Sequence, residues 1–139
     1  MEISLRLHIC RGNAPGGRWL AHGGYERIAS EVFPRLTNYD RFLLEYDTPR
    51  AGDFSPLRHI RPEAELALGL LTTKRGALED AGAVEARIRD ATQSIPLRRL
   101  ALSPQCGFAS GEAGNPLTPE EQEAKLRLVA QVARRVRRS

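Results

Sequence analysis

The sequence is poor in aromatic residues and in cysteine. Aromatic residues make up 6% of the 139 residues, and there are only two cysteines. The few aromatic residues are not interleaved with the basic ones, so the chain lacks the stacking surface typical of nucleic-acid-binding proteins, although its net charge is +4. We therefore expect no nucleic-acid partner.

The sequence also lacks any hydrophobic run long enough to cross a bilayer. At the N-terminus, no basic segment and apolar stretch precede a cleavage site, as they would in a secretory signal. We expect no membrane partner and a cytoplasmic location, in which the two cysteines stay reduced. A cysteine pair in that compartment is more often a metal-binding or catalytic feature than a disulfide.

The chain has the composition of one globular domain, with 41% hydrophobic and 27% charged residues. Strand and helix patterns alternate four times, which predicts an α/β fold with a parallel sheet. The predicted strands are 3–9, 42–45, 66–71 and 99–103, and the predicted helical segments are about 25–36, 54–58, 80–94 and 119 onward. Four such βα units correspond to the C-terminal half of a (β/α)8 TIM barrel, which typically needs about 250 residues. Because a half-barrel has two unpaired edges, we expect it to need an N-terminal half-barrel or self-association.

The last helix has the clearest start signal. Thr118-Pro119-Glu120-Glu121 combines an N-cap residue, a proline at the first helical position and a capping-box glutamate. Leu128, Val129, Val132 and Val136 recur at helical spacing and form an apolar stripe. The stripe predicts which face of this helix is buried.

Two thiols and one imidazole lie at predicted strand ends. Cys106 follows a short apolar run, and His8 and Cys10 end the first strand. Residues i and i+2 of a strand point the same way, so His8 and Cys10 can reach one metal ion. Glu45 ends the second strand. A zinc site with an open position, formed by His8, Cys10, Glu45 and Cys106, is therefore our leading hypothesis.

Other polar residues lie close to the same strand ends. Asp47 is the main rival of Glu45 for a place at the metal. Lys74 and Arg50 offer positive charge for an acidic substrate group, although a lysine at a strand end is more often solvated. The glycine-rich segment 12–24 lacks the spacing of a phosphate-binding loop. We expect it to act at most as a mobile lid over a substrate.

Three motifs resemble the zinc-binding motifs in the catalytic barrel of cobalamin-independent methionine synthases. They are His8-Ile9-Cys10, Leu44-Glu45-Tyr46-Asp47-Thr48 and Ser103-Pro104-Gln105-Cys106-Gly107. The resemblance covers essentially the whole chain, so residues 1–139 look like the C-terminal half of that barrel, from its fifth strand to its eighth helix. The segments 8–13, 47–54 and 106–110 are still more similar to shorter, single-barrel members, which include epoxyalkane:coenzyme M transferases and proteins labelled methionine synthase II.

The resemblance implies both a ligand set and a reaction. In this family, residues at the positions of His8, Cys10, Glu45 and Cys106 hold zinc, which presents a thiol substrate as a thiolate. The thiolate attacks an alkyl carbon and becomes a thioether. For a methionine synthase the thiol is homocysteine and the alkyl donor a methylated folate, whereas for the other members they are coenzyme M and an epoxide. Glu45, Asp47 and Lys74 are then the candidates for catalytic roles.

The sequence departs from the methionine synthase pattern in two places. Where those enzymes carry Asp-x-His-Ser, with a histidine that serves in acid catalysis, this chain has Leu70-Leu71-Thr72-Thr73-Lys74. The half of the barrel that holds the amino-acid and folate substrates is also missing. Three alternatives stay open: a zinc-dependent thiol alkyltransferase domain, a truncated zinc-binding module without turnover, and a structural half-barrel with inert cysteines.

Overall fold

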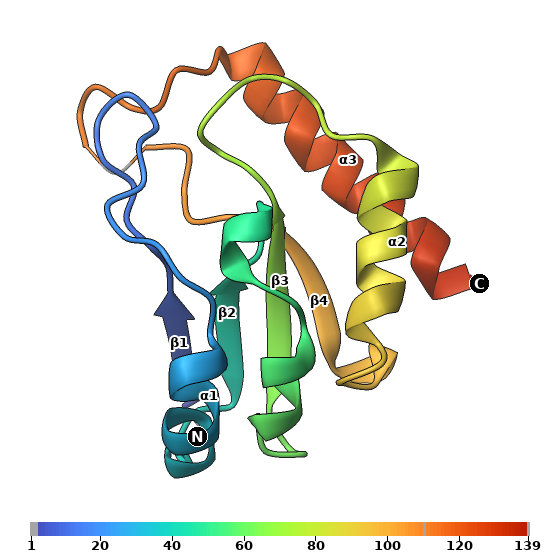
Figure 1. Cartoon of the computed structure of the whole chain (residues 1–139). Coiled ribbons are helices and arrows are strands. Elements are labelled where there is room, and N and C mark those ends of the chain that lie inside the picture. Colours follow the sequence, from blue (N-terminus) through green and yellow to red (C-terminus); the bar gives the residue numbers. More distant parts are fainter. Residues whose placement is uncertain (1–2, 110, 139) are drawn as a thin grey trace.

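The structure is a computed structural model that describes residues 3–109 and 111–138, and its centre is a four-stranded parallel sheet (Figure 1). The strands follow one another across the sheet in the order β1-β2-β3-β4. Their bounds are Arg6–Ile9 for β1, Arg41–Glu45 for β2, Glu65–Leu71 for β3 and Leu100–Pro104 for β4. All three neighbouring pairs are parallel. This confirms the predicted α/β fold with a parallel sheet.

A helical segment follows each strand. The α-helices of the described residues are α1 (Glu26–Val32), α2 (Ala81–Ala91) and α3 (Pro119–Arg138). Short 3-10 helices are η1 (Phe33–Arg35), η2 (Pro49–Ala51), η3 (Ser55–His59) and η4 (Leu97–Arg99). Among the described residues, no helix combines the length and the apolar character needed to cross a membrane.

The boundaries of several elements differ from the predicted ones. The first strand begins at Arg6 rather than at residue 3, because its neighbour β2 begins only at Arg41 and the two residues are partners in the register. Upstream, the Leu5 amide donates instead to the side chain of Asp40 at 2.8 Å. The first helix ends at Val32 and continues as η1, because Pro34 has no amide hydrogen to donate to the helix.

Side-chain caps define the starts of the two longer helices. The Asp80 side chain accepts a hydrogen bond from the Ala83 amide at the start of α2. At the start of α3, the Glu121 amide donates to the Thr118 hydroxyl at 3.2 Å and the Thr118 amide donates to the Glu121 carboxylate at 2.8 Å. This is the predicted capping box, in which two otherwise free amides are satisfied.

The hydrophobic core lies between the sheet and the helices. Alternate strand residues such as Phe42 and Leu44 are 0% and 1% exposed, and they share one apolar cluster with residues of the helices, such as Phe33 and Val132. Residues of α1, α2 and α3 all belong to this cluster, so the helices pack against the same face of the sheet (Figure 1). The strand residues between these core positions, such as His8 and Leu43, therefore face the side of the sheet that the helices do not cover.

Candidate metal centre

The carboxyl end of β1 and the loops that follow β1 and β4 bring together three metal-ligating side chains. The ligand atoms of His8, Cys10 and Cys106 all lie within 4.8 Å of one another. In a flat sheet β1 and β4 would be about 14 Å apart, which is three strand spacings of about 4.8 Å. The close approach therefore depends on the curvature of the sheet and on the loops that carry the cysteines.

The donor set of this triad suits zinc. Two sulfur atoms and one imidazole nitrogen are typical zinc ligands, and three protein ligands leave one position of a tetrahedral ion for water or substrate. Burial, together with the neighbouring Cys10, raises the pKa of Cys106 to about 12. A bound divalent cation reverses that effect, because it favours the thiolate form of its ligands. The triad is thus compatible with the predicted zinc site.

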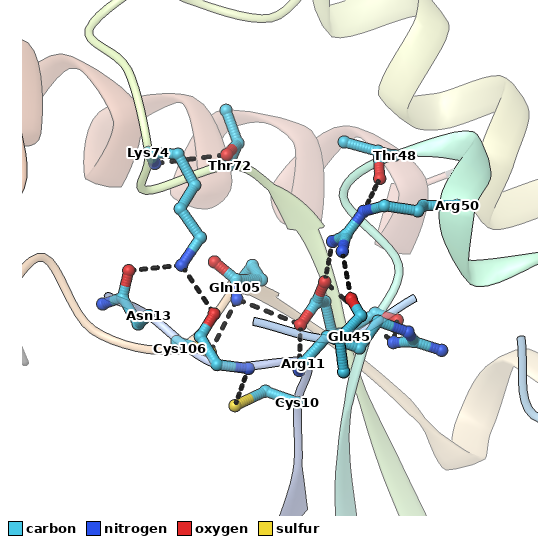
Figure 2. Close-up of polar contacts among 12 residues, drawn as sticks. Cys10, Arg11, Asn13, Glu45, Thr48, Arg50, Thr72, Lys74, Gln105 and Cys106 are labelled. Atoms are coloured by element: carbon cyan, nitrogen blue, oxygen red, sulfur yellow. Dashed lines mark hydrogen bonds and ion pairs between the residues drawn. The ribbon is translucent and has the colours of Figure 1, made fainter. Parts of the chain in front are cut away.

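Glu45 lies at the end of β2, but it does not belong to this triad. Its carboxylate is completely buried and forms an ion pair with Arg50. It also accepts hydrogen bonds from the Arg11 amide at 2.8 Å and from Nε2 of Gln105 at 3.2 Å (Figure 2). The role of Glu45 as a zinc ligand stays a prediction, since the carboxylate would have to exchange these partners for the metal.

Gln105 links Glu45 to the triad and was missed in the sequence analysis. Its side chain is 1% exposed. Its Nε2 lies 2.6 Å from Sγ of Cys106 and 3.2 Å from Oε2 of Glu45. The Thr73 hydroxyl donates to the Gln105 carbonyl at 2.9 Å and so fixes the backbone of this residue. The only signal in the sequence was its position beside Cys106 at a strand end.

Lys74 is buried rather than solvated. A lysine at a strand end is more often solvated, and that general tendency does not hold for Lys74. Only 5% of the residue is exposed, and its Nζ donates to the Gly12 carbonyl at 3.0 Å and to the side chain of Asn13. Burial lowers the pKa of Lys74, while the nearby acidic groups Cys106 and Glu45 partly oppose this effect. The loop 11–24 folds over the lysine, which local sequence cannot reveal.

Arg50 and Asp47 lie beyond the end of β2. The Arg50 guanidinium stacks over the Trp19 ring at 4.2 Å from its centroid and donates to the Ala21 carbonyl at 3.0 Å. The segment 11–24 is therefore anchored by the positive residues that it covers. Both carboxylate oxygens of Asp47 are buried, and neither has a hydrogen-bond partner of standard geometry. Burial raises the pKa of this group, and the neighbouring Thr72 side chain partly opposes the effect. Asp47 is not part of the triad either.

No protein-family model matches the chain. Two uncharacterized Bacillus subtilis proteins, YxjG and YxjH, are 48% and 47% identical to it over 133 residues. These matches cover 95% of this chain and 35% of each relative. The chain thus spans about a third of the length of the curated relatives it matches.

Two solved structures are also similar to the chain. A Listeria monocytogenes protein, provisionally named a vitamin-B12-independent methionine synthase, is 37% identical, with a TM-score of 0.67 over 96% of this chain and 35% of that protein. A B12-independent methionine synthase from Shewanella sp. W3-18-1, solved with selenomethionine, is 21% identical, with a TM-score of 0.75 over 99% of this chain and 40% of that protein. The second likeness shows the fold alone.

Proposed function

We propose that this chain is the zinc-binding part of a thiol methyltransferase of the cobalamin-independent methionine synthase type. The observation that carries the proposal is the triad of His8, Cys10 and Cys106, whose ligand atoms lie within 4.8 Å of one another at two strand ends. Catalytic residues of (β/α)8 enzymes lie at this carboxyl-terminal edge of the strands. The named Listeria structure points to the same family.

In the proposed reaction, His8, Cys10 and Cys106 hold the metal. Bound zinc supplies the charge that converts a thiol substrate to a thiolate at neutral pH. The thiolate sulfur forms a bond to the alkyl carbon with its own electron pair, and the donor leaves with the electrons of the broken bond. Homocysteine with a methylated folate is the pair that the family implies. Coenzyme M with an epoxide is the alternative.

The polar residues around the triad have distinct proposed roles. Glu45 is a fourth ligand if it leaves Arg50 when the metal binds, and otherwise it orients Gln105, which contacts both Glu45 and Cys106. The unsatisfied oxygens of Asp47 make it a candidate to contact a substrate donor group. Lys74 contributes positive charge beside the thiolates.

We also propose that the chain forms one half of a (β/α)8 barrel. The outer strands β1 and β4 have no further strand partner among residues 3–109 and 111–138. A groove of about 530 Å³ follows the β4 edge between that strand and α3, and its lining includes Leu97, Leu102 and Val136. In this proposal, further strands would come from a part corresponding to the relatives' length outside the match, which is about two thirds of it. Self-association is the alternative. A cytoplasmic location remains a prediction.

Zinc content tests the proposed site without knowledge of the substrate. We expect about one zinc ion per chain in the purified protein by elemental analysis. Cys10→Ser and Cys106→Ser should each lose it, whereas His22→Ala, which changes an exposed histidine outside the triad, should keep it. Zinc that survives Cys106→Ser would contradict the site. Zinc binding without alkylation of homocysteine or coenzyme M would favour a truncated module that binds metal but has no turnover.

A further inference from the structure

Three loops meet next to the metal triad in a hydrogen-bonded network. Lys74, in the loop after β3, donates from Nζ to the Gly12 carbonyl at 3.0 Å and to Oδ1 of Asn13, both in the loop after β1 (Figure 2). Asn115, in the loop after β4, donates from Nδ2 to the same Asn13 oxygen at 3.1 Å. Each of the three loops therefore contributes one side chain to a common point.

The network also contacts the backbone beside each cysteine. Nδ2 of Asn13 donates to the Gly107 carbonyl at 3.1 Å, and Gly107 directly follows Cys106. On the other side, the Gly12 amide lies 3.4 Å from Sγ of Cys10 as a hydrogen-bond donor. Two of the backbone acceptors of the network, the Gly12 and Gly107 carbonyls, thus lie only two positions and one position after Cys10 and Cys106.

The sheet alone cannot hold the two cysteines together. They follow β1 and β4, which are the first and last strands of the sheet and share no hydrogen bonds. Cys106 in addition has a φ of 46°, a left-handed conformation that is unusual for a residue with a side chain. Such a conformation persists only where the surroundings enforce it. Asn115 provides one such constraint, because its Nδ2 also donates to the Thr73 carbonyl at 2.7 Å and so fixes the loop to the end of β3.

The positive charge of Lys74 also acts on the metal triad electrostatically. Within the described residues, its ammonium group forms no ion pair within 4.0 Å, and its acceptors are the neutral oxygens of Gly12 and Asn13. A site with two thiolates and a bound thiolate substrate carries one negative charge more than a divalent cation neutralises. A buried ammonium group next to that site offsets the excess charge.

We propose that Lys74, Asn13 and Asn115 are positioning residues that hold the two cysteine-bearing loops at the spacing that zinc requires. The inference rests on the proposed function, since it takes His8, Cys10 and Cys106 as the zinc ligands. The network preorganises the site, so less ordering of the loops remains to be done when the metal binds. Loss of the network lowers the affinity for zinc while all three ligands remain in place.

Competition for zinc with a chromogenic chelator, using the 139-residue chain, tests this role. We expect Lys74→Met and Asn115→Ala each to weaken zinc binding by about 10- to 100-fold, the usual effect of losing a group that orients metal ligands. Lys125→Met is the matched control, because Lys125 is also buried but binds Glu79 and the Ala77 carbonyl instead. It should lower stability and leave the zinc affinity of the folded protein unchanged.

Absorption of the cobalt(II)-substituted protein provides a second measurement, which would not change if Lys74 and Asn115 only stabilised the fold. Its thiolate-to-cobalt charge-transfer absorption should keep its intensity at saturation in Lys74→Met and Asn115→Ala, since both cysteines still bind, while more cobalt is needed to reach it. Because Asn13 and Asn115 share a hydrogen bond, Asn13→Ala combined with Asn115→Ala should cost less than the product of the single effects.

The outcomes separate this inference from the proposed function. A folded, unaltered chain that binds no zinc overturns both. Zinc binding in the unaltered chain with the same affinity in Asn115→Ala and Lys74→Met overturns the positioning role alone. An equal loss in Lys125→Met also overturns it, because the effect would then follow from general destabilisation. If Lys74→Met fails to fold, the milder Asn115→Ala decides the question.

Discussion

Arg50→Met should destabilise the protein strongly, because it leaves Glu45 buried without its closest countercharge. The side chains of Arg50 and Glu45 are 15% and 0% exposed. Removing one partner of a buried ion pair typically costs about 3–5 kcal/mol. We expect about 3 kcal/mol, the lower end of that range, because Arg11 remains 4.0 Å from the Glu45 carboxylate and its amide still donates to it.

An exposed ion pair on α3 provides the matched control. Arg127 and Glu123 pair at 2.6 Å, but their side chains are 77% and 61% exposed. Arg127→Met should therefore cost less than about 0.5 kcal/mol. The double variant Arg50→Met with Glu45→Gln should be more stable than Arg50→Met alone, because the buried negative charge is gone as well. Replacement of an arginine by methionine thus costs much or little stability, depending on whether its carboxylate partner is buried or exposed.

Urea unfolding measures these differences. The chain has a single tryptophan, and Arg50 stacks on its ring at 4.2 Å, so the fluorescence of Trp19 reports on this part of the molecule. Circular dichroism is the second probe, because Arg50→Met also alters the surroundings of Trp19. With a urea dependence of about 2 kcal/mol per M, a loss of about 3 kcal/mol lowers the midpoint by about 1.5 M. The reasoning would be refuted if the urea midpoints of Arg50→Met and Arg127→Met agreed within about 0.3 M.

Two further predictions concern the glycine-rich loop and the last helix. Gly16→Ala and Gly17→Ala both place a side chain in a left-handed conformation, at φ values of 76° and 69°, which costs about 1 kcal/mol. Only at Gly17 would the new Cβ lie 2.5 Å from the Lys74 carbonyl oxygen, so Gly17→Ala should lower the melting temperature clearly more than Gly16→Ala; equal shifts would contradict the close contact. Thr118→Ala removes the cap of α3 and should cost about 1 kcal/mol by thermal unfolding, whereas Ser94→Ala, outside any helix cap, should be nearly neutral.

The strands, helices and the metal triad were accessible from the sequence because they depend on local patterns. Apolar periodicity identified all four strands, and Thr118 with Glu121 identified the start of α3. The two-residue spacing of His8 and Cys10 predicted that they share a face, and parallel strands place their ends at one edge. Their approach to Cys106 agrees with that prediction.

The contacts between loops were not accessible in this way. The burial of Lys74 depends on residues 12 and 13, which lie about 60 positions away. Gln105 meets Glu45 although their strands, β4 and β2, are separated by β3. Arg50 meets Glu45 because η2 follows β2 directly and brings the chain back over the strand end. No periodicity encodes such crossings, since the residues involved belong to loops of irregular conformation. The sequence therefore predicted candidate ligands but not the contacts of the polar residues around them.

The positions of the two cysteines just beyond the outermost strands have a mechanical consequence. An ion bound by Cys10, His8 and Cys106 would link the ends of β1 and β4, which share no hydrogen bonds. The distance between its ligands would limit how far apart these two strand ends can lie, and so would fix the curvature of the sheet. Removal of the ion would let the curvature relax, so a chelator would change the shape of the sheet as well as the loops that carry the sulfur atoms.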